Sequence, residues 1–75
     1  MSLNALGKEL RSFRKKNRYQ VQHMLEITGF SKSNLWALTT RNDINPRLET
    51  MIVLAKFMHK SVGFIANLAA ESRKE

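Results

Sequence analysis

The sequence predicts an all-α fold of five helices, and three observations favour it. Apolar residues recur at spacings of three and four, the period of an amphipathic helix. Polar stretches containing Gly, Ser, Asn or Pro separate these segments, as expected where helices end and begin. No strand pattern, repeat or low-complexity segment is apparent. A chain of 75 residues accommodates one domain, residues 1–75, with a core expected over about residues 3–70.

The first helix is expected over about residues 3–16. Its apolar stripe lies opposite Lys8, Arg11 and Lys15. The residues of the stripe are Leu3, Leu6, Leu10 and Phe13. Basic residues follow at the end of this segment, where cations interact favourably with the helix dipole.

Residues 20–39 are the most informative stretch of the chain. They predict two short helices, over about residues 20–28 and 31–39, joined by a tight turn at Gly29. Glycine adopts the left-handed conformation without a Cβ penalty, so it suits the residue just after a helix. Ser31 is a suitable N-cap, with Phe30 placed to begin a hydrophobic staple. Two helices around such a turn form a helix-turn-helix.

Two further helices are expected in the second half of the chain. Asn42 is a candidate for a left-handed residue ending the third helix, and Asn45 followed by Pro46 predicts the N-cap and first residue of the fourth. The fourth helix is apolar nearly all round, so it is either central or exposes a face to a partner. Ser61 is expected to cap a fifth helix, and the charged tail 71–75 is expected to fray.

The chain is strongly basic, with 13 Lys and Arg against 6 Asp and Glu, a net charge of +7 and a pI near 10.4. Residues 1–47 hold most of the basic side chains, which favours an anionic partner on that side, although basic residues also simply solvate helix surfaces. The chain has no Cys, and neither a signal peptide nor an apolar run of bilayer length is apparent. A cytoplasmic location is therefore expected.

Over about residues 6–68 the chain resembles the lambda-repressor/Cro-like helix-turn-helix domains, known as the Xre family. The matching positions are Leu10, Arg14, Met24, Gly29, Phe30-Ser31, Leu35, Leu38, Asn45-Pro46 and Leu48-Glu49-Thr50-Met51. The chain departs from the family pattern at Val21 and Leu25, where glutamine and alanine are usual. It departs again at Thr39, where the family has a glutamate that pairs with the arginine matched by Arg14.

The resemblance implies a compact five-helix domain whose third helix lies in the major groove of DNA. The residues expected to contact DNA are Gln22, Ser31, Lys32, Ser33, Asn34, Trp36, Ala37, Arg41 and Asn42. Lys32 is suited to guanine, Ser33 to either kind of base edge and Ala37 to a thymine methyl group. Gln22, Arg41 and Asn42 are expected at phosphates. Trp36 either contacts the DNA surface or packs sideways on the protein.

The expected function is that of a sequence-specific regulator, a repressor that binds a palindromic operator as a homodimer through its fourth and fifth helices. The alternatives are an antitoxin-type protein of the same fold that binds a toxin, and an interaction module that has lost specific DNA binding. An enzyme is not expected, because His23 and His59 are isolated and no nucleophile is paired with a base. No metal or cofactor is expected.

Overall fold

A computed structural model describes residues 2–74, and this range contains five helices and no strand. The helices are α1 (Ala5–Lys16), α2 (Val21–Thr28), α3 (Lys32–Thr40), α4 (Leu48–Met58) and α5 (Val62–Lys74). The Cα radius of gyration is 11.1 Å and the extents are 29 × 27 × 21 Å. The expected all-α class and the number of helices are therefore confirmed for the described residues.

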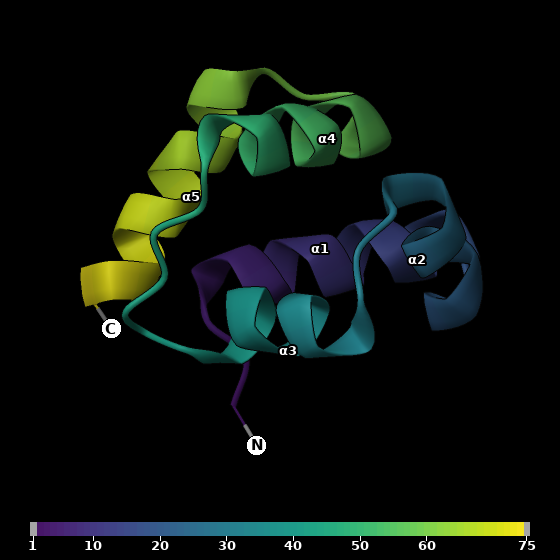
Figure 1. Ribbon diagram of the computed structural model, residues 1–75, viewed down its shortest axis with the longest axis horizontal. Coiled ribbons are helices and arrows are strands. Elements are labelled where there is room, and N and C mark those ends of the chain that lie inside the picture. The colour runs from purple at the N-terminus through teal and green to yellow at the C-terminus, as the bar shows by residue number, and fades with distance from the viewer. Residues whose placement is uncertain (1, 75) are drawn as a thin grey trace.

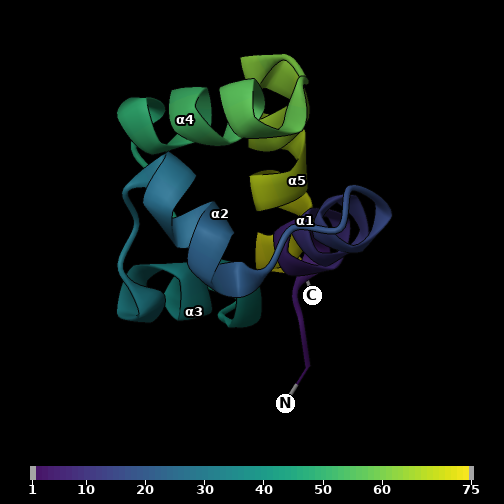
Figure 2. The same cartoon turned by 90° about the vertical axis from the view of Figure 1, so that its right-hand side faces the viewer.

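In Figure 1, α1 crosses the middle of the view, α4 crosses the top, α3 lies along the bottom and α5 descends the left side. After a turn of 90° about the vertical axis, α3 and α4 remain at opposite edges, with α2 between them (Figure 2). The edge formed by α3 is thus separated from the edge formed by α4.

The core lies where α1, α4 and α5 meet. Leu6 and Leu10 of α1 are buried there against Leu54 and Met58 of α4 and Ile65 of α5. The apolar stripe predicted for the first helix therefore faces this core. No single helix in residues 2–74 is long and apolar enough to cross a bilayer. Only α4 and α5 taken together satisfy those two conditions, and a bend of 113° separates them.

An aromatic cluster closes the end of the core next to α2. The ring of Tyr19 lies 6.2 Å from that of Phe13, 5.3 Å from that of Phe57 and 5.2 Å from that of His23. These contacts bring together α1, α2, α4 and the segment that connects the first two helices. The contact of Tyr19 with Phe57 attaches that connection to α4.

The turn between α2 and α3 matches its prediction. Gly29 has φ of +77° and its N–H donates to the carbonyl oxygen of Leu25 at 2.8 Å. The hydroxyl of Ser31 accepts from the N–H of Asn34 at 3.1 Å, so it caps α3 as expected. Phe30 packs against the core, which sets the direction in which the chain enters α3.

The expected starts of the first and fourth helices are wrong. α1 begins at Ala5 because the side chain of Asn4 caps it, accepting from the N–H of Gly7 at 2.7 Å. α4 begins at Leu48 with an extended Arg47 as its N-cap, so Asn45 and Pro46 precede the helix. Ile44 is buried in the core four residues before α4. The backbone of Arg47 is extended, with φ of −70° and ψ of 159°, so the helix starts only after it.

The expected end of the third helix is also wrong, because Asn42 does not have a left-handed backbone. Among described residues other than glycine, only Arg18 and His59 have positive φ. α3 ends at Thr40, and the backbone of the following Arg41 is extended, with φ of −88° and ψ of 152°. The carbonyl oxygen of Arg41 accepts a hydrogen bond from Asn4, and this long-range contact replaces the expected local helix stop.

The charged tail does not fray over the residues described. α5 continues to Lys74, and Ser72 is completely buried. The hydroxyl of Ser72 accepts from the N–H of Leu6 at 3.1 Å and donates to the carbonyl oxygen of Leu68 at 2.9 Å. Arg73 donates to the carbonyl oxygen of Ile44 at 3.1 Å. Residue 75 lies outside the described residues.

Candidate nucleic-acid interface

α3 packs on the rest of the molecule through one side only. Leu35 and Leu38 are half-buried against the core, as the sequence predicts, and no residue of α3 is fully buried. Gly7 of α1 lies directly against Thr39, where a Cβ atom on the glycine would overlap the carbonyl oxygen of the threonine. Because α1 covers this side, the opposite side of α3 remains accessible.

Five of the nine predicted contact residues line a shallow hollow of about 590 Å³ on that accessible side, which we call the α3 depression. They are Lys32, Ser33, Trp36, Ala37 and Arg41. The four that belong to α3 have the spacing of one helix face, and Arg41 follows the last helical residue. Trp36 is 51% exposed, so its ring does not pack into the core. The structure thus brings together residues of the types that contact base edges.

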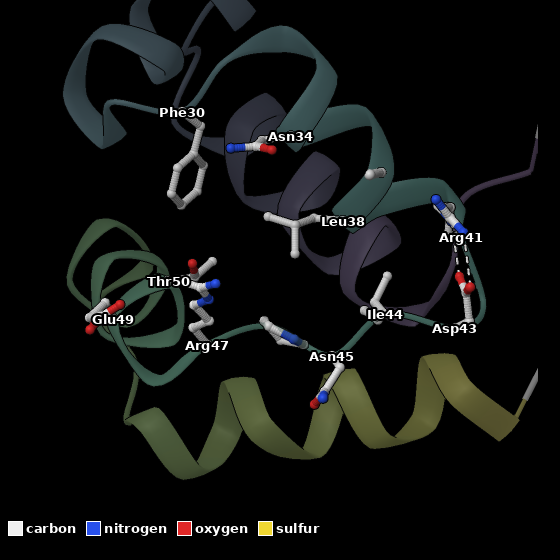
Figure 3. Close-up of a pocket in the computed structure, with 12 residues that line it drawn as sticks. Phe30, Asn34, Leu38, Arg41, Asp43, Ile44, Asn45, Arg47, Glu49 and Thr50 are labelled. Carbon is white, nitrogen blue, oxygen red and sulfur yellow. Dashed lines mark hydrogen bonds and ion pairs between the residues drawn. The ribbon is translucent and has the colours of Figure 1, made fainter.

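Asn34 points in another direction. It lines an open groove of about 650 Å³ between α3, the connection before α4 and the first turn of α4, which we call the α3–α4 groove. Figure 3 shows Asn34 and Phe30 projecting from the α3 side toward Arg47 and Thr50. Ala37 and Arg41 line both the α3–α4 groove and the α3 depression.

The other three predicted contact residues do not line the α3 depression. Gln22 is exposed in the first turn of α2, and Asn42 is exposed in the bend after α3. Ser31 is exposed, but its hydroxyl already accepts the capping bond from the N–H of Asn34. Ser31 and Asn42 are chain neighbours of residues that line the α3 depression, whereas Gln22 belongs to another helix.

Arg41 forms a two-point ion pair with Asp43, a residue that the sequence did not single out. Arg41 Nε donates to Asp43 Oδ1 and Nη2 donates to Oδ2, both at 2.9 Å. The two side chains are 56% and 70% exposed. The hydrogen bonds, followed by the opposite charge, hold the pKa of Asp43 below its usual value and the pKa of Arg41 above its own. The pair therefore stays ionised at neutral pH.

Asn4 positions the end of α3, and the sequence did not reveal this role. Its Nδ2 donates to the carbonyl oxygens of Leu38 at 2.9 Å and Arg41 at 2.6 Å. Its backbone N–H donates to the carbonyl oxygen of Thr39 at 2.8 Å. An asparagine just before an apolar-periodic segment is a recognisable N-cap signal, so the cap was predictable. The bonds to α3 were not, because they join residues more than 30 positions apart.

Arg14 has a partner other than the glutamate usual in the family. Its Nη1 donates to the carbonyl oxygen of Tyr19 at 3.1 Å. The guanidinium thus ties the last turn of α1 to the segment that leads into α2. This contact gives Arg14 a structural role despite the threonine at position 39.

The two histidines lie apart on the surface. His23 and His59 are exposed, with their rings against Tyr19 and Phe13 respectively. No group of three or more His, Asp or Glu within residues 2–74 is arranged to hold a metal ion. Comparisons of the chain with protein-family models, curated proteins and solved structures gave no match.

Proposed function

We propose that this protein is a sequence-specific double-stranded DNA-binding regulator of the lambda-repressor/Cro-like type, in which α2 and α3 form the helix-turn-helix. The short connection between these helices supports the proposal, since Gly29 is left-handed and Ser31 caps the helix that follows. The class commonly acts through a dimer that occupies an operator, and we propose a repressor of this kind.

The observation that carries the proposal is the α3 depression. α3 has nine residues and is therefore about 13 Å long, a size that the major groove of B-DNA admits. Lys32 and Ser33 lie in its first turn, the part of a recognition helix that contacts base edges. In this arrangement Lys32 donates to guanine and Ala37 meets a thymine methyl group. The half-exposed ring of Trp36 contacts the DNA surface.

The charge of the chain supports an anionic partner. A net charge of +7 on 75 residues attracts the phosphate backbone over a distance set by the ionic strength. Gln22 and Asn42 are exposed, so they are available to phosphate oxygens. The affinity for DNA is therefore expected to fall as the salt concentration rises.

The placement of the helices limits how a homodimer can form. α3 and α4 occupy opposite edges in both views (Figures 1 and 2). This placement favours a two-fold dimer that joins through a flank and presents both α3 helices to one side of a duplex. We propose the flank along which α5 runs, with the adjoining end of α4.

A second candidate function is binding to a protein partner, as in an antitoxin. Ile27 and Leu48 are large apolar residues with exposed fractions of 50% and 60%. Ile27 and Val53 line a hollow of about 280 Å³ between α2 and α4, apart from the α3 depression. Exposed apolar residues near a hollow suit a protein partner better than a phosphate backbone.

Selection of bound sequences from a random duplex DNA pool, with purified protein at physiological salt, tests the main proposal. We expect an enriched palindrome whose half-sites lie about 34–36 Å apart. Binding without enrichment that is lost steeply as salt rises would indicate a counterion-driven contact only. That result would favour the protein-partner alternative.

A further inference from the structure

Arg41 occupies the boundary between the two hollows beside α3. It lines both the α3 depression and the α3–α4 groove, just after the last helical residue of α3. It lines the α3 depression together with Lys32 and Trp36, the surface that the proposed function places in the major groove.

The pairing with Asp43 leaves one particular edge of the guanidinium free. An arginine side chain carries five N–H donors in a planar fork. Asp43 accepts from Nε and from one N–H of Nη2 (Figure 3). These two donors lie along one side of the planar guanidinium group. The two N–H groups of Nη1 and the second N–H of Nη2 remain. They form the end of the fork, which is the edge that donates two parallel bonds to O6 and N7 of guanine.

The pairing also changes which ligand the arginine prefers. Attraction to a phosphate depends on net charge, and the carboxylate of Asp43 cancels the charge of Arg41 at a contact distance of 2.9 Å. Hydrogen bonding to a base edge depends on donor direction, which the two bonds to Asp43 hold in place. The pair therefore favours a base contact over a backbone contact.

We propose that Arg41 reads a guanine in each half-site and that Asp43 is the positioning residue that directs it there. This inference depends on the proposed DNA-binding function and replaces the phosphate contact that the sequence suggested for Arg41. Asp43 thereby becomes a determinant of sequence preference without touching DNA.

The test compares binding of the wild-type protein and two variants to the selected duplex, to duplexes with each base pair replaced, and to random duplex. The first variant is Arg41→Gln/Asp43→Asn, which removes the pair but keeps its net charge of zero. We expect it to lose the preference for guanine at one base pair per half-site, with affinity for the selected duplex reduced roughly 5- to 150-fold. The slope of log affinity against log salt is expected to stay unchanged.

The second variant, Asp43→Asn, frees the charge of Arg41. We expect the guanine preference to weaken, the affinity for random duplex to rise, and the salt slope to steepen by about 0.9, the value for one added phosphate contact. Both side chains are exposed, so both variants should melt within a few degrees of the wild-type protein.

The binding results distinguish a failure of the proposed guanine contact from a failure of the proposed DNA-binding function. A wild-type protein that enriches no sequence overturns both. A wild-type protein that enriches a sequence, and a double variant that keeps every base preference, overturns the guanine contact alone. A double variant with uniformly weaker binding and a shallower salt slope would show that Arg41 contacts a phosphate, which also overturns it.

Discussion

At the scale of single residues, Asn4 connects two helices that are distant in the sequence. It is only 2% exposed. Its side-chain oxygen accepts a hydrogen bond from the first turn of α1, and its side-chain nitrogen donates to two carbonyl oxygens at the end of α3. No buried side-chain polar atom in the described residues lacks a hydrogen-bond partner, so these bonds satisfy groups that would otherwise be costly to bury. The side chain thereby holds the end of the proposed recognition helix.

Asn4→Ala should lower the free energy of unfolding by about 2–4 kcal/mol, because a helix cap is lost and two carbonyl oxygens lose their donor. Urea denaturation measures the free energy of unfolding of each variant. Asn17→Ala is the matched control, since Asn17 is exposed and makes one side-chain bond, to the carbonyl oxygen of Phe13. Equal losses in the two variants would contradict the role assigned to Asn4.

Lys32→Ala should weaken binding to the selected duplex by about 1–3 kcal/mol and remove a preference at one base pair, as expected for a lost base contact. Lys16→Ala at the end of α1 serves as control, because its effect should be small and the same for every sequence. Fluorescence anisotropy titrations at fixed salt measure both. A uniform effect of Lys32→Ala would remove this residue from base reading.

At the scale of helices, the three glycines meet different constraints. Gly7 allows α1 to approach the backbone of α3, and Gly29 provides the left-handed residue after α2. Gly63 lies in the first turn of α5, where the nearest atom to an added Cβ would be 3.9 Å away. Only the requirement at Gly29 was visible in the sequence, because it follows from the residues around it.

The three Gly→Ala variants should therefore differ in stability. Gly7→Ala should cost about 1–3 kcal/mol, since the backbone carbonyl of Thr39 cannot move aside cheaply. Gly29→Ala should cost about 1–2 kcal/mol for a left-handed alanine. Gly63→Ala should be neutral or stabilising by up to about 1 kcal/mol. Thermal denaturation ranks the three variants by stability. A Gly7→Ala variant as stable as the wild-type protein would show that α1 and α3 pack less closely than the Gly7–Thr39 contact implies.

At the scale of the whole molecule, the last turn of α5 closes the fold onto its beginning. Ser72 bonds the first turn of α1, and Arg73 bonds the connection that precedes α4. Ser72 therefore satisfies one free N–H at the start of α1 while Asn4 satisfies another. The end of the chain is in this way part of the scaffold that holds α1 and, through Asn4, α3.

Ser72→Ala should lower the free energy of unfolding by about 1–3 kcal/mol, because the N–H of Leu6 is buried and loses its acceptor. Ser12→Ala provides the comparison, since Ser12 is an exposed residue of α1 and should change stability by less than about 0.5 kcal/mol. Denaturant titration distinguishes them. Similar midpoints for the two variants would indicate a frayed α5 terminus.

The helical class, the five segments and the turn at Gly29 and Ser31 were predictable from the amino-acid sequence. Each depends on residues within one or two turns of each other: an apolar period, a glycine that accepts positive φ, a hydroxyl that caps the next helix. The exposed face of α3 was predictable for the same reason, since its buried residues Leu35 and Leu38 define the opposite side.

The start of α4, the helical state of the charged tail and the orientation of Arg41 depend on contacts between distant parts of the chain. The extended backbone of Arg41 is held by Asn4, 37 residues earlier in the chain, and the pairing with Asp43 takes place in that bend. Ile44 is buried in the core just before α4, and the helical tail is bonded to the rest of the fold through Ser72 and Arg73. These contacts join distant parts of the chain, so they exist only once the helices have packed together.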